Sequence, residues 1–174
     1  MPKAAAIALA GPISSGKSSV AALIGAEIDA PVVSFGSLIR SEQPEGATRE
    51  RLQEAGSQML DRLGPPGLRD AALQACGVDP AEIPVIWEGI RHRSVLEAVA
   101  DLYAPKRVLL FMLAPPEQDR RRRASAEAGS EQRLARWEEH ETESLGDLAV
   151  LAELRITAPT PQAATEQILA HLAN

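Results

Sequence analysis

The sequence predicts an α/β fold in three layers, in which a parallel sheet is covered by helices on both faces. Apolar runs of strand length alternate with longer amphipathic segments along the chain. This alternation indicates parallel strands joined by right-handed helical crossovers. The first run, Ala4–Ala10, is apolar throughout, as expected of a strand with neighbours on both edges. We therefore expect a five-stranded sheet of order 2-3-1-4-5 with this strand at its centre.

The predicted strands are short apolar runs bounded by proline, glycine or charged residues. The third of them ends in a carboxylate, Glu88, and the fourth is apolar after its first residue. The five segments are Ala4–Ala10, Val32–Phe35, Ile83–Glu88, Arg107–Leu113 and Glu153–Thr157.

The longest predicted helix follows the second strand. Thr48 is placed to cap a helix over Arg49–Leu63, with Leu52, Met59 and Leu63 facing a core, and Gly64–Gly67 is expected to stop it. A charged helix is expected after Ala114–Glu117, because two prolines precede a run of four arginines. Other helices are expected over 18–24, 38–40, 68–76, 94–103, 133–144 and 162–172.

A phosphate-binding motif joins the first strand to the first helix. Gly11–Ser18 has the sequence Gly-Pro-Ile-Ser-Ser-Gly-Lys-Ser and matches G-x-x-x-x-G-K-[ST], the P-loop. Its glycines permit close backbone approach, and its N–H groups form an anion-binding nest at a helix N-terminus. Lys17 supplies an ammonium for the outer phosphates, and Ser18 supplies a hydroxyl for Mg²⁺. The predicted nucleotide-binding residues are Gly11, Ser14, Ser15, Gly16, Lys17, Ser18 and Ser19.

The composition limits the classes of function. With 174 residues, a single domain over 1–174 is expected. The net charge is -6, with a pI near 5.1, which argues against broad nucleic-acid binding. We expect no membrane span, since no apolar run is long enough. The one cysteine, Cys76, fits a reducing compartment, so a cytoplasmic location is expected.

With these motifs, the chain resembles the nucleoside-monophosphate-kinase-like branch of P-loop proteins. Within that branch it is most similar to adenylate-kinase-like and dephospho-CoA-kinase-like ATPases. The resemblance rests on the P-loop and on Ser34–Arg40, Val85–Arg91 and Ala114–Glu117. It implies a P-loop three-layer α/β/α fold with two helical insertions, an acceptor-binding one at 36–78 and a lid at 115–144. Neither insertion has a strong apolar stripe, which is typical of segments that move.

The resemblance also implies roles for single residues. Arg40 and Arg91 would bind the phosphate of the acceptor, and the loop Thr157–Thr160 would hold adenine. Lid arginines would close over the transferred phosphoryl group, with Arg120 and Arg123 from the first part of the lid and Arg133 or Arg136 from the second. Glu88 would orient Mg²⁺ through water, although aspartate is usual at this position.

The sequence therefore predicts an ATP- and Mg²⁺-dependent phosphotransferase that acts on a small phosphate-bearing acceptor, such as a nucleotide or dephospho-CoA. The predicted catalytic residues are Lys17, Glu88, Arg120, Arg123 and Arg136, and the predicted metal-binding residues are Ser18 and Glu88. Two alternatives stay open. One is a regulatory nucleotide-binding protein or inactive kinase homologue, favoured by glutamate at position 88. The other is a kinase of small metabolites such as sugars or acids.

Overall fold

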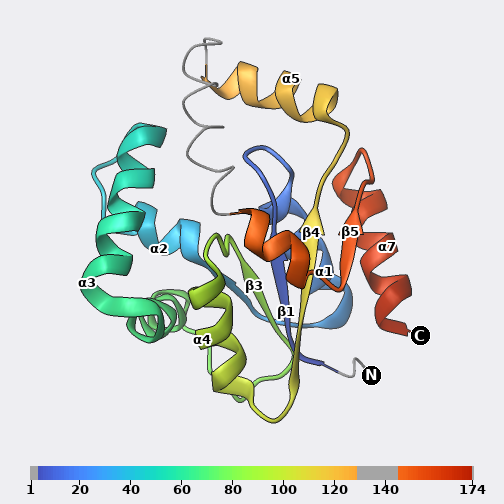
Figure 1. Cartoon of the computed structure of the whole chain (residues 1–174), viewed down its shortest axis with the longest axis horizontal. Helices are drawn as coiled ribbons and strands as arrows, with labels where there is room; N and C mark the ends of the chain where they lie inside the picture. The colour runs from blue at the N-terminus through green and yellow to red at the C-terminus, as the bar shows by residue number, and fades with distance from the viewer. Residues whose placement is uncertain (1–3, 129–144, 174) are drawn as a thin grey trace.

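A computed structural model describes residues 4–128 and 145–173 of the chain. Its centre is a parallel sheet of five strands in the order β2-β3-β1-β4-β5, which confirms the predicted order (Figure 1). The strands are β1 (Ala4–Ala10), β2 (Val32–Ser34), β3 (Val85–Glu88), β4 (Arg107–Leu113) and β5 (Leu154–Ile156).

Helices cover both faces of this sheet, and the side chains of β1 alternate between them. Ile7 and Leu9 belong to a core shared with α1 (Lys17–Ile28) and α7 (Pro161–Ala173). Ala6, Ala8 and Ala10 belong to a second core, shared with α3 (Arg49–Cys76) and α4 (Arg93–Tyr103). The small alanine side chains leave room on this second face for Trp87, which is fully buried. The three-layer α/β/α architecture is therefore confirmed.

The second strand is one residue shorter than predicted. Phe35 begins α2 (Phe35–Ser41) instead of ending β2. The reason is local, because the Ser34 hydroxyl accepts a hydrogen bond from the Ser37 backbone N–H at 3.0 Å and so caps the helix.

The predicted stop at Gly64–Gly67 is a kink inside α3. Gly64 alone leaves the helical conformation, with φ 66° and ψ 169°, and the helix resumes at Pro65. Proline is tolerated there because the first turn of a helix needs no N–H donor. Met59 is buried as predicted, but the prediction that Leu63 faces a core is wrong, since Leu63 just before the kink is 38% exposed.

The predicted lid segment is described only in part. Its first half forms α5 (Glu117–Ala128), which lies across the end of the molecule where the strands finish (Figure 1). Residues 129–144, with Arg133 and Arg136, lie outside the described part. A further helical segment covers 145–151. Among the described helices, none combines the length and the hydropathy that a membrane crossing requires.

Candidate functional site

The loop between β1 and α1 has a geometry that depends on its two glycines. Gly11 has φ 150°, and a Cβ there would lie 2.5 Å from the Leu113 carbonyl oxygen at the end of β4. Gly16 has φ 90° and precedes α1 as its N-cap, so no side chain caps the first turn. The N-terminus of α1 is thus open to an anion, whose charge the helix dipole favours.

Lys17 is held against this loop. Its Nζ donates to the carbonyl oxygens of Gly11 at 2.7 Å and Pro12 at 2.8 Å. It also lies 3.4 Å from the Ser15 hydroxyl. The ammonium is therefore already beside the loop that the motif predicts to bind phosphate.

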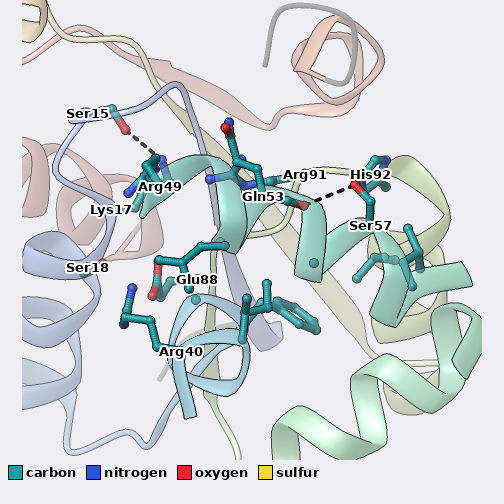
Figure 2. A pocket seen from close by; sticks show the side chains of 18 of the residues that line it. Ser15, Lys17, Ser18, Arg40, Arg49, Gln53, Ser57, Glu88, Arg91 and His92 are labelled. Carbon is teal, nitrogen blue, oxygen red and sulfur yellow. Dashed lines mark hydrogen bonds between the residues drawn. The ribbon is translucent and has the colours of Figure 1, made fainter. Parts of the chain in front are cut away.

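One cavity of about 530 Å³ joins this loop to the segments after β2 and β3. Figure 2 shows Ser15, Lys17, Ser18 and Arg40 on one side of the cavity, Ser57 and His92 on the other, and Glu88 between them. The predicted site residues that line it are Ser14, Ser15, Gly16, Lys17, Ser18, Ser19, Arg40, Glu88 and Arg91. Residues predicted from separate motifs thus meet at the carboxyl ends of the strands, where open α/β sheets bind ligands.

Glu88 lies at the centre of the cavity wall and is 5% exposed. Its Oε1 accepts a hydrogen bond from the Ser34 hydroxyl, the same hydroxyl that caps α2. A buried carboxylate needs such a partner to offset its lost hydration. Because Ser34 and Glu88 are paired residues of neighbouring strands, the sheet register itself brings them together.

Three arginines line the cavity from three different elements. Arg40 comes from α2, Arg91 from the loop after β3, and Arg49 from the first turn of α3. The Arg40 guanidinium donates to the Ser37 hydroxyl at 3.3 Å. Sequence reasoning missed Arg49, although its position directly after the Thr48 cap was predicted. The available signal was helical spacing, since Arg49, Gln53, Gly56 and Leu60 follow one face of α3 and all line the cavity.

His92 is a second residue that sequence reasoning missed. It lines the cavity next to Arg91 and directly precedes α4. Burial lowers the pKa of His92 below its usual value of 6.5, and the neighbouring Arg91 charge lowers it further, while Asp61 acts in the opposite direction. The neutral imidazole is therefore favoured at neutral pH.

The α5 arginines lie outside this cavity. Arg123 donates through Nε to the Ser14 carbonyl oxygen at 3.2 Å and through Nη1 to the Pro159 carbonyl oxygen at 3.4 Å. It thereby joins the P-loop to the predicted adenine loop, beside a small cavity of about 10 Å³. Arg120 is half-buried on the same helix. Arg121 and Arg122 pair with Glu117 and Asp119 of their own helix.

The residues present fit a nucleotide phosphate with Mg²⁺. Among the described residues, no three His, Cys, Asp or Glu side chains gather as a metal cage. Mg²⁺ at nucleotide sites needs only one or two protein ligands, because phosphate oxygens and water complete its shell. Ser18, exposed in the first turn of α1, and Glu88 line the same cavity and offer such ligands. Arg136, predicted to act with them, lies outside the described residues.

Comparison with solved structures shows the fold. The chain is similar to a gluconokinase from Sinorhizobium meliloti 1021, with TM-score 0.61, 18% identity and coverage of 99% of this chain and 94% of the other. A shikimate kinase from Bacteroides thetaiotaomicron gives TM-score 0.59, 14% identity and coverage of 97% and 98%. The protein TT1252 from Thermus thermophilus gives TM-score 0.61 and 18% identity, with coverage of 97% of this chain and 95% of the other. No protein-family model and no curated protein matches the sequence. The chain thus has the P-loop nucleoside-monophosphate-kinase-like fold.

Proposed function

We propose that this protein is an ATP- and Mg²⁺-dependent phosphotransferase that moves the γ-phosphate to a small phosphate-bearing acceptor, such as a nucleotide or dephospho-CoA. One observation carries the proposal. The P-loop and three arginines, Arg40, Arg49 and Arg91, line a single cavity of about 530 Å³. Such a cavity has room for the phosphates of a donor and the anionic group of an acceptor side by side, as transfer requires.

The P-loop side of the cavity binds the donor in this proposal. Backbone N–H groups of Ser14–Ser19 would hold the phosphates at the N-terminus of α1, and Mg²⁺ would be held by the Ser18 hydroxyl and, through water, by Glu88. Bound Mg²⁺ would neutralise charge that develops on the transferred group. Lys17 turns from the Gly11 and Pro12 carbonyls towards the outer phosphates, which are stronger partners for an ammonium.

The arginine side of the cavity binds the acceptor. Guanidinium groups bind phosphate through two parallel hydrogen bonds, so Arg40, Arg49 and Arg91 suit an acceptor that carries phosphate. Glu88 would orient Mg²⁺ through water, or take the proton if the acceptor group is a hydroxyl. Arg120 and Arg123 of α5, with Arg136, close over the transferred group and exclude water.

Two alternative functions remain for the test. A small-metabolite kinase is favoured by the names of two structural neighbours, gluconokinase and shikimate kinase. Its acceptor would carry a carboxylate or hydroxyls, and guanidinium groups bind a carboxylate as well as a phosphate. A regulatory nucleotide-binding protein would bind ATP in the same place without transfer of phosphate.

We propose a cytoplasmic location for the protein. The support is its single cysteine, which fits a reducing compartment.

The proposed function is tested by a screen for ADP release with ATP, Mg²⁺ and one acceptor at a time. The acceptors are the nucleoside 5′-monophosphates, dephospho-CoA, gluconate and shikimate. Lys17→Met is the control for contaminating activity, since loss of one charge-stabilising group costs about a hundredfold or more in kcat. Turnover with a phosphate-bearing acceptor supports the proposal. Turnover with gluconate or shikimate alone favours the metabolite kinase, and ATP binding without turnover favours the regulatory protein.

Arg91→Ala should weaken acceptor use far more than ATP use. Loss of one bidentate, charge-assisted contact costs roughly 2–4 kcal/mol, or about thirty- to a thousandfold in kcat/KM for the acceptor. Steady-state kinetics with each substrate varied in turn measures this. Arg93→Ala is the matched control, because Arg93 lies two residues away but pairs with Glu97 at 2.7 Å. Equal weakening of ATP and acceptor by Arg91→Ala would contradict the assignment of the arginine side.

A further inference from the structure

Ser34 lies next to the cavity wall without lining the cavity itself. It is buried at the end of β2, and Glu88, its partner on β3, does line the cavity. The proposed role of Glu88 towards Mg²⁺ depends on the direction of its carboxylate. A glutamate side chain turns about three bonds, so its carboxylate has many positions unless another contact holds it. The hydroxyl of Ser34 supplies such a contact.

The direction of the hydrogen bond between these two side chains is determined by their other partners. The Ser34 hydroxyl accepts a hydrogen bond from the Ser37 backbone N–H at 3.0 Å and has one proton of its own to donate. An ionised carboxylate has none, so the hydroxyl proton is directed at Glu88 Oε1. One oxygen of the carboxylate is thereby held on the Ser34 side, and the other, Oε2, is left for a partner in the cavity.

The Ser34 hydroxyl is a rigid anchor, because contacts with three elements hold the residue in place. Its backbone is paired with that of Glu88 in the parallel sheet. Its N–H lies 3.5 Å from the Cys76 sulfur at the end of α3, and its hydroxyl caps α2. Residues that orient a metal-binding side chain from behind act through hydrogen bonds of this kind.

We propose that Ser34 is a positioning residue, whose hydroxyl holds Oε1 of Glu88 so that Oε2 is directed at the water shell of bound Mg²⁺. Ser34 itself would touch neither the metal nor a substrate. This role rests on the proposed function, because it takes Mg²⁺ to be bound between the P-loop and Glu88. It adds that a residue outside the cavity controls the orientation of that carboxylate.

The test measures by calorimetry how much Mg²⁺ strengthens the binding of a non-hydrolysable ATP analogue. For each protein, the Kd of the analogue in EDTA is divided by its Kd in Mg²⁺. This ratio should fall by about tenfold in Ser34→Ala, since loss of a residue that orients a metal ligand costs about 10- to 100-fold in metal affinity or activity. The Kd in EDTA should stay within twofold. In kinetics, kcat should fall while the acceptor KM stays within about threefold.

Three further variants separate positioning of Glu88 from capping of α2. Ser34→Gly removes the hydroxyl but keeps a residue that caps helices nearly as well, so it should lower the ratio as much as Ser34→Ala does. Ser34→Thr keeps the hydroxyl and should restore the wild-type ratio. Ser41→Ala is the matched control, because the exposed Ser41 hydroxyl donates to the Leu38 carbonyl oxygen at 2.8 Å, at the other end of α2. Its ratio should be unchanged.

A double-mutant cycle with Glu88→Gln shows whether Ser34 acts through Glu88. In the Glu88→Gln background, Ser34→Ala should cause no further loss of the ratio, because the charge that it positions is already absent. Losses that add in full would mean that Ser34 acts elsewhere. A ratio within twofold of wild type in folded Ser34→Gly would also overturn the proposal, since Ser34 would then be a helix cap alone.

The same binding measurement separates this proposal from the proposed function. If wild type binds the analogue more tightly with Mg²⁺ but transfers phosphate from ATP to no acceptor, the kinase proposal fails. A lower ratio in Ser34→Ala and Ser34→Gly would then still support the positioning role. If Mg²⁺ does not strengthen binding to wild type, the Mg²⁺ site and the role of Ser34 are both overturned.

Discussion

Ser34, the last residue of β2, forms hydrogen bonds with residues of α2, β3 and α3. Its hydroxyl caps α2 and donates to Glu88 on β3. Its backbone N–H lies 3.5 Å from the Cys76 sulfur at the end of α3. Sequence reasoning included Ser34 in a motif for Arg40 but gave it no role of its own. The pairing with Glu88 depends on which strands are neighbours, so it follows only once the sheet order is known.

His92 should make the stability of the protein depend on pH. Burial and Arg91 lower its pKa in the folded state, so the unfolded chain, with a pKa near 6.5, binds a proton more readily. The free energy of unfolding should therefore fall as pH drops below that value. Urea unfolding of wild type and His92→Gln at about pH 7.5 and about pH 5.5 measures this. Wild type should lose stability relative to the variant at the lower pH, and parallel pH profiles would refute the argument.

At the scale of elements, the periodicity of the sequence predicts most helices and strands but misplaces some of their ends. The strand that was predicted to start at Ile83 begins at Val85, and the stop at Gly64–Gly67 is a kink. Both errors have one physical cause. Proline and glycine interrupt a pattern locally. Whether the strand or helix continues across them depends on tertiary packing, which the local sequence does not determine. The roles of 36–78 and 115–144 as acceptor-binding insertion and lid stay predictions.

Helix α5 should become more ordered when ATP and Mg²⁺ bind. Within its described side chains Ala124 is the fully buried one, while Arg123 connects the helix to the P-loop and to Pro159. Such a helix has few apolar contacts and should open readily without ligand. Hydrogen exchange of Glu117–Ala128 should therefore slow by about fivefold or more on addition of ATP and Mg²⁺.

Two variants show whether Arg123 carries this effect. Arg123→Ala should reduce the ligand-dependent protection, because both of its carbonyl contacts are lost. Arg122→Ala should leave it intact, since Arg122 is exposed and pairs with Asp119 at 3.3 Å. Slow exchange of α5 already present without ligand would count against any closing motion of this helix.

At the scale of the whole molecule, the sequence was sufficient for the fold and for the part of the cavity wall formed by the P-loop, Arg40, Glu88 and Arg91. The apolar run of β1 predicts which strand is central, and the P-loop motif predicts which strand end the cavity adjoins. The contributions of Arg49, Gln53 and His92 were not predicted. Arg49 and Gln53 lie on one face of α3 and His92 directly precedes α4, so they reach the cavity wall only through the packing of these helices against the sheet. Residues of a sequence motif can be identified from the sequence, whereas the other residues of a cavity wall can be identified only from the folded structure.

Trp87 links the sheet to α2 and α4, so its replacement measures how much these contacts contribute to the stability of the protein. It is fully buried on β3, next to Glu88, and its Nε1 donates to the Tyr103 hydroxyl of α4 at 3.3 Å. Its ring contacts Phe35 of α2, with centroids 5.7 Å apart. Trp87→Phe leaves a cavity and an unpaired buried hydroxyl, so it should lower the free energy of unfolding by about 2–3 kcal/mol. Urea unfolding followed by circular dichroism measures the loss.

A double-mutant cycle separates the hydrogen bond from the volume of the ring. Tyr103→Phe alone should cost about 1 kcal/mol, because it removes the partner of the indole N–H. In the Trp87→Phe background the same change should be neutral or stabilising, since it removes a hydroxyl that has already lost its donor. Strictly additive costs would mean that the two groups do not interact in solution. The contact between β3 and α4 at this point would then be apolar packing of the two rings, without a hydrogen bond that contributes to stability.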